Sequence, residues 1–436
     1  MAIEYLKRGK SDAARAEEDA KTAAVVTAPL QDIETRGDVA VRKLANKFDG
    51  YDRESYRLTA SEIEALMAEV RPEDMADIKF AQEQVRNFAQ AQRDSMQDIE
   101  VETLPGVILG HKNIPVQSVG CYVPGGKFPM VASAHMSVAT ASVAGVPRII
   151  AATPPFNGKP NPAVIAAMHL GGAHEIYVLG GIQAVGAMAL GTQSIEPVHL
   201  LVGPGNAFVA EAKRQLFGPV GIDMFAGPTD SLVIADATAQ ALTVAWDLAG
   251  QAEHGANSPV WLVTDHEPLA REVLRLVPEC IASLPSPNRE AAAAAWEALG
   301  EVILCADRKE MAAEADRIAP EHLHVQAAHL DWWKARLSAY GSLFLGENST
   351  VAYGDKAAGP NHVLPTSGAA RYTGGLSVHK FLKVVTWQRV DDLAAGAELA
   401  RVTAAISREE GMEGHARTAD IRLEKLTPRP RLVVGG

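Results

Sequence analysis

The sequence is poor in cysteine and in long apolar runs. Among its 436 residues there are 3 cysteines, Cys121, Cys280 and Cys305, which are far apart and odd in number. A disulfide framework and a paired-cysteine metal site are therefore not expected, and the thiols are predicted to be buried. No apolar run reaches the roughly 18 residues that a membrane-spanning helix needs, so no membrane association is expected.

Concentrated positive charge is also missing. The net charge is −12 and no basic run occurs, which argues against nucleic acid and anionic membranes as partners. Residues 1–12 are too charged for a secretory signal, and we expect a cytoplasmic protein. A small anionic substrate remains open, because a few Lys or Arg side chains in a cleft can outweigh a negative surface.

The order of the predicted elements indicates an α/β protein. A chain of 436 residues that is 47% hydrophobic and 22% charged is long for one core, so two or more domains are expected. Predicted helices cover most of residues 12–95, and short β-type runs follow at 101–123. Alternating strands and helices come next, first over 131–216 and again over 231–345. Such alternation predicts parallel sheets with helices on their faces.

An apolar helical run at 239–248 ends in polar side chains that could open a metal site. Gln251 and His254 are three positions apart, so on a helix they project from one face and can bind the same ion. Asp355 lies in a Gly- and Pro-rich stretch, 353–366, which resembles an active-site loop. Its carboxylate could supply an oxygen ligand.

A fourth ligand is missing from both strand and helix successions. The tail, residues 391–422, is predicted to be helical and polar, a composition that suits docking on another surface rather than forming a core. This tail contains His415, the best remaining candidate for completing the metal shell from a partner subunit.

Glycine turns follow three predicted strands in the first half of the chain. The turn VGPGN (202–206) comes after a predicted strand and opens a helix, as a pyrophosphate-binding turn does. It lacks the full dinucleotide fingerprint, because Phe208 stands at the place of the third glycine, and alone it could be an ordinary tight turn. The turns at 122–126 and 180–183 end neighbouring strands, so the three turns are expected to converge on one ligand-binding crevice.

Glu321 and His322 form a candidate acid/base pair. They stand at a predicted strand start, directly after Pro320, which ends the preceding helix. A carboxyl group beside an imidazole suits proton transfer. A solvated loop is the ordinary alternative for such a pair, but the apolar strand that follows weakens that alternative.

Longer motifs run through the chain: GCYVPGG, VGPGN, IDMFAGPTDS, QAEHG, APEHL, GDKAAGPNHVLPT, GLSV and EGMEGH. Together they resemble the histidinol dehydrogenase family, over almost the whole sequence. The family implies an α/β fold of two incomplete Rossmann-like parallel-sheet domains, a helical N-terminal segment and a helical C-terminal tail swapped between the subunits of a homodimer. The implied boundaries are an arm at 1–20, a first Rossmann-like domain at 21–115 plus 230–378, a second at 116–229 and the tail at 379–436.

The resemblance also implies Zn²⁺ and NAD as cofactors, and roles for single residues. The implied zinc ligands are Gln251, His254, Asp355 and, from the other subunit of the dimer, His415. The implied catalytic acid/base residues, in the first domain, are Glu321 and His322. The implied NAD contacts, in the second domain, are Tyr122, Gln183 and Asn206. The implied substrate contacts are Thr229, Glu410, His322 and the residues of the metal site.

Several positions depart from the pattern of the family's histidinol oxidisers. Those enzymes have Ser-Glu after AGP, where this chain has Thr229 and Asp230, and Glu after PEHL, where it has His324. After the GD aspartate they have an uncharged or aromatic residue, where this chain has Lys356. A site for a protonated amine should keep its carboxylate, because a buried ammonium without a partner is costly.

The same departures favour a small anionic substrate. Lys127 and Lys380 add positive charge near VPGG and GLSV, and Lys or His strengthens an anion site. The stretches PEHLHV, AGPTDS and GLSVHK resemble the branch of the family that oxidises a dihydroxypropanesulfonate, a small polyol sulfonate. His324 is the favoured substrate contact among the basic residues, with Lys356 as a further candidate. A surface side chain is the alternative for each lysine.

This resemblance implies a four-electron oxidation through a bound aldehyde, with two hydride transfers to NAD. His322 would take the hydroxyl proton, and Glu321 would activate water for the second oxidation. A histidinol dehydrogenase acting on an amino alcohol is the nearer alternative. A zinc hydrolase, in which Glu321 activates water and no nucleotide binds, is the more distant one.

Overall fold

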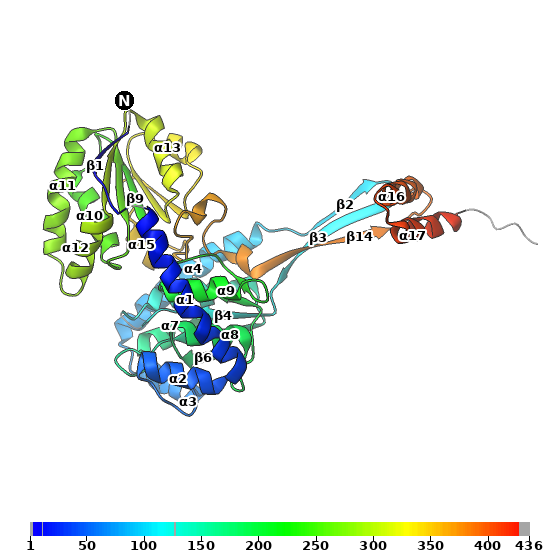
Figure 1. Ribbon diagram of the computed structural model, residues 1–436, viewed down its shortest axis with the longest axis horizontal. Coiled ribbons are helices and arrows are strands. Elements are labelled where there is room, and N and C mark those ends of the chain that lie inside the picture. The colour runs from blue at the N-terminus through cyan, green and yellow to red at the C-terminus, as the bar shows by residue number, and fades with distance from the viewer. Residues whose placement is uncertain (1–2, 11, 126–127, 427–436) are drawn as a thin grey trace, which may run out of the picture. The chain divides into compact units, whose positions relative to one another are not determined.

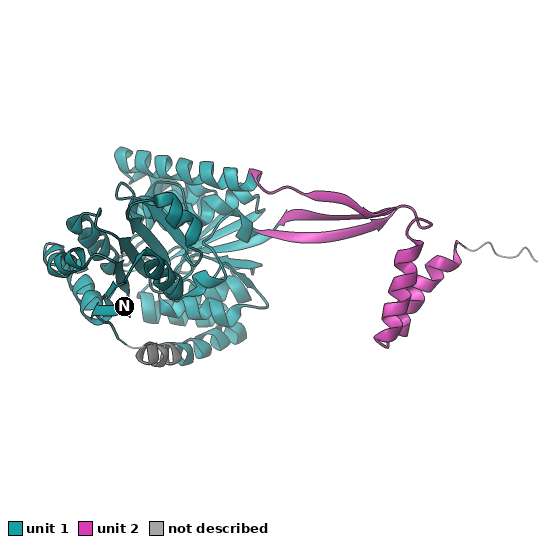
Figure 2. Cartoon of the chain, turned by 90° about the horizontal axis from the view of Figure 1, so that it is seen from above, with its two compact units in different colours: residues 1–93, 115–381 teal, residues 94–114, 382–436 magenta. Residues whose placement is uncertain are grey.

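The computed structural model describes residues 3–10, 12–125 and 128–426. The chain divides into two compact units, each discontinuous in sequence (Figure 2). The larger unit comprises residues 1–93 and 115–381, and the smaller one residues 94–114 and 382–436. Part of the expected N-terminal arm (1–20), part of the tail, and Lys127 lie outside the described residues. The domain boundaries expected from the sequence stay a prediction.

A six-stranded sheet forms one half of the larger unit. Its strand order is β1-β11-β10-β9-β12-β13, and all neighbours are parallel except β1 with β11. The central strands are buried along their whole length, which explains the largely apolar sequences of β9 and β10. Strand β12 is equally buried but alternates His322, His324 and Gln326 with apolar residues. The strands are β1 (Glu4–Lys7), β9 (Ser231–Ala235), β10 (Val260–Thr264), β11 (Glu301–Leu304), β12 (His322–Gln326) and β13 (Ser342–Leu345).

Helices cover both faces of this sheet (Figure 1). On one face Val233 and Leu262 pack with α10 (Ala241–Ala252), α11 (Glu267–Ala282) and α12 (Asn288–Leu299). On the other face the alternate strand residues pack with α13 (Arg308–Ile318) and α14 (Leu330–Arg336). Because side chains alternate along a strand, one apolar run can serve both cores.

A five-stranded parallel sheet forms the other half of the larger unit, in the order β6-β5-β4-β7-β8. Helices α1 and α2 pack on α8, and α1 also packs on α9. The strands are β4 (Ser118–Tyr122), β5 (Arg148–Thr153), β6 (Glu175–Val178), β7 (Leu200–Val202) and β8 (Gly221–Ile222). The helices are α1 (Asp12–Arg36), α2 (Asp38–Asp49), α3 (Ala60–Ala68), α4 (Pro72–Asp94), α7 (Pro162–Gly171), α8 (Gly181–Leu190) and α9 (Ala207–Leu216).

The smaller unit combines a three-stranded sheet with a helical hairpin. The sheet has the order β14-β3-β2, from β2 (Ile99–Leu104), β3 (Val107–Pro115) and β14 (Leu382–Val390). Helices α16 (Ala397–Glu409) and α17 (Glu413–Glu424) pack through Ala404, Ala416 and Ala419. The small alanine side chains let the two helix backbones approach each other, which explains the alanine spacing of this segment.

The predicted α/β fold with two parallel sheets is confirmed, and the three cysteines are buried as expected. None of the described helices is long and apolar enough to cross a membrane. The first helical segment of the alternating region consists of α5 (Val131–Ala134), a π-helical turn (His135–Ala139) and α6 (Thr140–Ala144). The helical tail is confirmed in α16 and α17, but it is preceded by β14, a strand that the sequence analysis did not expect.

Candidate active site

A cavity of about 810 Å³ lies in the larger unit. Its lining comes from segments that follow strands of both parallel sheets, as expected for the ligand site of such sheets. From the five-stranded half come Tyr122, Gln183 and Asn206. From the six-stranded half and its connections come Thr229, Gln251, His254, Glu321, His322, Asp355 and Lys356. The structure therefore brings together most of the side chains that the sequence singled out.

The three glycine turns meet at one wall of the cavity. Tyr122 ends β4, and its hydroxyl accepts a hydrogen bond from the backbone N–H of Gly181 at the start of α8 (3.1 Å). Gln183 is buried and donates from Nε2 to Oδ2 of Asp49 (2.9 Å). Its Oε1 has no hydrogen-bond partner among the described residues. A buried acceptor of this kind suits a donor group of a bound molecule.

Asn206 caps the first turn of α9, where Oδ1 accepts hydrogen bonds from the backbone of Phe208 and Val209 (both 3.1 Å). The turn before it needs glycine, because a Cβ at Gly205 would lie 2.4 Å from Cγ1 of Val209. Gly203 adopts φ +117°, a conformation that favours glycine. The backbone at this helix start can therefore come close to a ligand, as pyrophosphate binding requires.

A buried ion pair supports the same turn from behind. Lys213 and Asp223 are both almost fully buried and form an ion pair. Lys213 Nζ also donates to the carbonyl oxygen of Gly203 (2.8 Å), while Asp223 Oδ2 accepts from the Gly203 N–H (2.8 Å). Both peptide groups of the turn are thereby fixed, so the ligand-facing backbone is held before any ligand binds.

Glu321 and His322 lie side by side in the opposite wall, at the start of β12. Asp230 holds Glu321 twice: Asp230 Oδ1 accepts from the Glu321 N–H (2.6 Å), and Glu321 Oε2 accepts from the Asp230 N–H (3.1 Å). The Nδ1 atom of His322 is 3.6 Å from Oε2 of Glu321, and its Nε2 atom is 3.3 Å from Oδ1 of Asp355. The imidazole thus stands between two carboxyl groups.

Burial and neighbouring charge shift the pKa values of this group. Burial raises the pKa of Glu321 to about 8. Burial alone would lower the pKa of His322, but the Glu321 and Asp355 carboxyl groups raise it. Burial would also raise the pKa of Asp355, yet its contact with His322 lowers it to about 2. Perturbed values of this kind in a cavity are typical of an active site.

The expected metal ligands of this chain line the cavity together. Gln251 ends α10 with its Oε1 buried and without a hydrogen-bond partner among the described residues, and His254 follows one turn later. Asp355 is buried in α15 (Val351–Lys356). In the described part of the chain no group of three or more His, Cys, Asp or Glu side chains could hold a metal. An amide oxygen, an imidazole and a carboxylate nevertheless form a donor set that fits zinc with one ligand still to be supplied.

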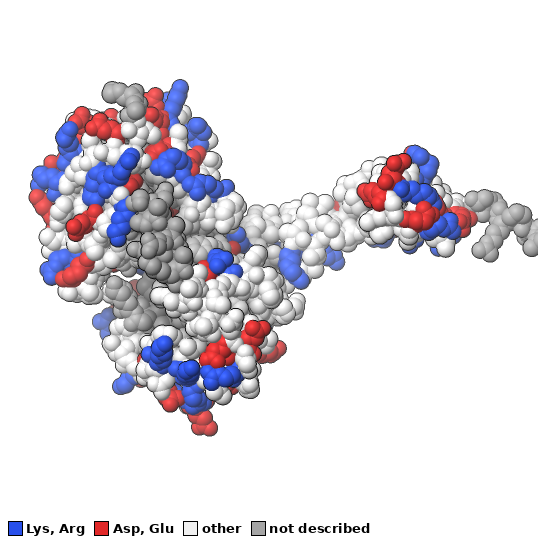
Figure 3. Space-filling model, in the orientation of Figure 1, with Lys and Arg blue, Asp and Glu red and all other residues white. Residues whose placement is uncertain are grey.

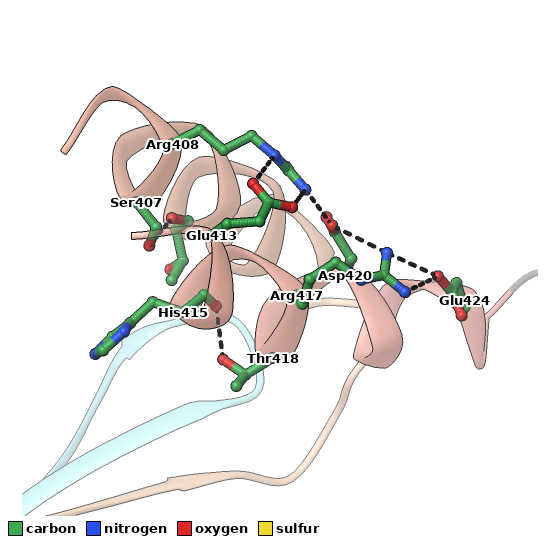
Figure 4. A network of polar contacts seen from close by, with 9 residues as sticks. Ser407, Arg408, Glu413, His415, Arg417, Thr418, Asp420 and Glu424 are labelled. Atoms are coloured by element: carbon green, nitrogen blue, oxygen red, sulfur yellow. Dashed lines mark hydrogen bonds and ion pairs between the residues drawn. The ribbon is translucent and has the colours of Figure 1, made fainter. Parts of the chain in front are cut away.

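His415 and Glu410 belong to the smaller unit, where both side chains are exposed. Glu410 ends α16, and His415 lies in the first turn of α17. Figure 4 shows the His415 side chain pointing away from the ion-pair network in which Arg408 binds Glu413 and Asp420. His415 is therefore not used within that network, and its role as a metal ligand stays a prediction.

Of the basic residues proposed as substrate contacts or anion-binding residues, one lines the cavity and two do not. Lys356 lines the cavity, is exposed, and makes no hydrogen bond or ion pair with any other described residue. His324 does not line the cavity: its side chain is fully buried, and Nε2 donates to the carbonyl oxygen of Gly346 (2.9 Å). Lys380 also lies outside the lining and donates to Oγ1 of Thr373 (2.6 Å).

The sequence analysis missed cavity residues that come from distant segments. Asp49 at the end of α2 contacts Gln183, but nothing in the charged helix that carries it singles it out. His362 was quoted only within a motif. Its Nδ1 lies 2.8 Å from the carbonyl oxygen of Asp355, and its Nε2 lies 2.9 Å from Oγ of Ser133. Burial lowers the pKa of His362 to about 4, so it is neutral near neutral pH.

Glycine turns and a buried acid/base pair that line one cavity define the class of protein, an α/β enzyme with its ligand site at the carboxyl ends of parallel strands. The particular family follows from comparison with known proteins. The model of the family described as histidinol dehydrogenase matches residues 12–423. The chain therefore belongs to the histidinol dehydrogenase family.

Its relatives carry different names. A protein of Ruegeria pomeroyi described as a histidinol dehydrogenase homolog is 62% identical over 414 residues, which cover 94% of this chain and 95% of the relative. The sulfopropanediol 3-dehydrogenase of Ruegeria pomeroyi is 56% identical over 433 residues, which cover 98% of each chain. The crystal structure of histidinol dehydrogenase from Elizabethkingia anophelis matches with a TM-score of 0.87 at 34% identity and covers 92% of each chain. The protein is accordingly a dehydrogenase of this family.

Proposed function

We propose that the protein oxidises the primary alcohol of (R)-2,3-dihydroxypropane-1-sulfonate to the carboxylate of (R)-3-sulfolactate, using zinc and NAD. The observation that carries the proposal is the placement of exposed Lys356 in the same cavity as the buried Glu321 and His322. A cation without a protein partner beside an acid/base pair suits an anionic alcohol. The 56% identity to a sulfopropanediol 3-dehydrogenase supports the same substrate.

NAD would bind along the wall of glycine turns. Its pyrophosphate would lie against the start of α9, where the helix dipole attracts an anion. Gln183 would pair its Oε1 with a donor on the cofactor, and Tyr122 and Asn206 would border the same wall. The exposed rings of Phe48 and Phe208 also line the cavity and offer apolar surface to a base.

Gln251, His254 and Asp355 would hold zinc, with His415 of the partner subunit as the fourth ligand. A zinc ion bound there would polarise the substrate hydroxyl and lower its pKa. His322 lies 3.3 Å from Asp355 and is therefore close enough to receive a proton from a substrate oxygen beside this site.

His322 and Glu321 would divide the proton transfers of two successive oxidations. In the first, His322 would accept the hydroxyl proton as the same carbon gives up its hydride, which leaves an aldehyde. In the second, Glu321 would remove a proton from the water that adds to the aldehyde, and the hydrate would give up the remaining hydride. Bound NAD would supply the hydride acceptor, so that one alcohol and one water would yield one carboxylate, two NADH and three protons.

The sulfonate would bind near Lys356, with Thr229 on the same cavity lining. Glu410, in the smaller unit, stays a predicted substrate contact. Lys356 follows Asp355 directly, so the anionic end of the substrate would lie beside the metal ligands. The proposal does not depend on His324 as a substrate contact, because that side chain lies outside the cavity lining.

The first experiment is a stoichiometry measurement. Zinc-loaded protein is mixed with NAD and either racemic dihydroxypropanesulfonate or histidinol, and NADH is followed at its absorbance band. About two NADH per sulfonate consumed, with none from histidinol, would support the proposal. Turnover of histidinol alone would assign the protein to histidinol oxidation, and hydrolysis without NADH would remove the dehydrogenase mechanism.

A homodimer with shared sites is proposed as well. Exposed apolar residues of the smaller unit, Val384, Ile406 and Ile421, offer a surface for a second copy. Mixing His415→Ala with Glu321→Gln chains tests whether His415 acts across the dimer. If it does, each mixed dimer has one intact site, and random reassembly restores about a quarter of the wild-type rate of acid formation. If His415 acted within its own chain, no mixed dimer would form the acid at a restored rate.

A further inference from the structure

Behind the cavity wall, one carboxylate connects the elements that carry the proposed metal and acid/base residues. Asp247 lies on α10, and its side chain is 13% exposed. Its Oδ2 accepts a hydrogen bond from Nε2 of Gln326 on β12 (2.6 Å) and lies 3.3 Å from Nδ1 of His324 on the same strand. Its Oδ1 accepts from Oγ1 of Thr350 (2.9 Å). We call these four side chains the Asp247 network.

Each member of this network is close in the chain to a residue of the proposed site. Asp247 precedes Gln251 by one helical turn, so both project from the same face of α10. His324 lies two positions after His322 and therefore on the same side of β12. Thr350 caps α15, the helix that carries Asp355. The network thus connects α10, which carries Gln251, with β12, which carries His322, and with α15, which carries Asp355.

His324 has the hydrogen-bonding pattern of a positioning residue. Its Nε2 must carry a proton, because it meets the carbonyl oxygen of Gly346, which can only accept. Its other nitrogen faces Asp247 and Gln326. The ring of Phe344 lies 6.4 Å from the His324 ring and 6.1 Å from the His322 ring, so it packs against both.

We propose that His324 and Asp247 are positioning residues that fix the metal ligands and His322 relative to one another, and that His324 does not contact the substrate. This inference rests on the proposed function for the identity of the site. Carboxylate and imidazole groups just behind metal ligands fix the orientation of those ligands. The network reaches Gln251, His322 and Asp355 through their own elements, so loss of one member should disturb the whole site.

The test compares His324→Phe with the unaltered full-length protein. Phenylalanine keeps a ring against Phe344 but loses the contacts with Gly346 and Asp247. We expect zinc affinity, measured by competition with a chelator in the absence of substrate, to fall by about 10- to 100-fold. With saturating zinc, kcat should fall by about 10-fold or more, while KM for the sulfonate and Kd for NAD should change by less than about threefold.

Matched variants separate positioning from general loss of stability. His324→Gln keeps one donor and should recover part of the zinc affinity. Thr350→Val removes only the hydrogen bond to Asp247 and the cap, and should give a smaller loss in the same direction. Glu314→Gln removes a buried carboxylate contact on α13, outside the cavity lining, and should leave zinc affinity unchanged.

Two results would overturn the inference. The first is unchanged zinc affinity and unchanged kcat in His324→Phe. The second is a rise of about 10-fold or more in KM for the sulfonate, with no change for an uncharged diol, because that would make His324 a substrate contact. Since zinc affinity is measured without substrate, this test stands apart from the proposed function, which fails if the unaltered protein does not oxidise the sulfonate.

Discussion

The two walls of the cavity are built from similar strand and helix units but differ in chemistry. The wall from the five-stranded sheet has glycine turns with the uncharged side chains of Tyr122, Gln183 and Asn206. Its carboxylate, Asp49, is bonded to Gln183. The wall from the six-stranded sheet has ionisable groups at its centre, Glu321, His322 and Asp355. In the first wall backbone groups face the ligand, whereas in the second wall side chains do.

This difference separates binding from chemistry. A wall of glycine turns at a helix start can hold a cofactor without taking part in proton transfer. The opposite wall buries carboxyl groups beside an imidazole, and the resulting pKa shifts suit proton transfer. Figure 3 shows Lys, Arg, Asp and Glu interspersed over the visible face of the larger unit, so the protonation chemistry is set inside the cavity and not by the charge of that surface. Changes in one wall should therefore leave the function of the other intact.

The largest effect is expected from Glu321→Gln. It removes the proposed base for water but keeps a side chain of the same size, so formation of the acid should fall by about 100- to 10,000-fold. The first oxidation should fall by less than about 10-fold, because His322 remains. Single-turnover measurements of NADH with an aldehyde trap follow both steps. Glu253→Gln, another cavity carboxylate, is the control, and equal loss of both steps in Glu321→Gln would refute the division of roles.

Gln251→Leu should lower zinc affinity without lowering NAD affinity. It removes the buried amide oxygen that lacks a protein partner, so zinc affinity should fall by at least about 10- to 100-fold. Titration of NAD by protein fluorescence should give a Kd within about twofold of the unaltered protein, because hydrogen bonds of the other wall are untouched. A parallel loss of NAD affinity would mean that the walls are coupled.

Lys356→Gln addresses selection of the substrate. We expect KM for the sulfonate to rise by about 10-fold, since one charge-assisted contact is lost, and KM for an uncharged diol to stay within about twofold. Steady-state kinetics with both substrates measures the ratio. The exposed lysine Lys334 on α14 lies outside the cavity, and Lys334→Gln controls for a change in net charge. An equal rise in KM for both substrates would contradict the proposal that Lys356 binds the sulfonate.

The smallest effect is expected from Gln183→Leu in the neutral wall. Loss of one hydrogen bond to the cofactor and one to Asp49 should raise the Kd for NAD by about 5- to 10-fold. Zinc affinity should be unchanged in the same preparation. If zinc affinity fell as well, Gln183 would support the charged wall, and the assignment of separate tasks would be wrong.

The elements themselves could be predicted from the sequence because their signals are local. Apolar runs predicted β9 and β10, and periodic helices predicted α10 to α13. Strand β12 was predicted from its position after Pro320. Strand β14 was missed because its Lys, Gln and Arg residues conceal the pattern and because its partner β3 lies far away in the sequence. Helix α15, which Thr350 caps, was also missed, because it is short and has no apolar periodicity. It overlaps the stretch 353–366, which was expected to be a loop.

The sequence by itself determined the residue types of the site, since glycine turns, an amide and imidazole at helical spacing and a Glu-His pair are each local patterns. Only the tertiary structure decided which of them share a cavity. It added Asp49 from a distant segment and His362 from the stretch that contains Asp355, and it placed His324 outside the cavity lining, where Gly346 and Asp247 contact its ring nitrogens. The physical reason is that a hydrogen-bond partner is chosen by packing across the fold, and spacing along one chain segment contains no information about it.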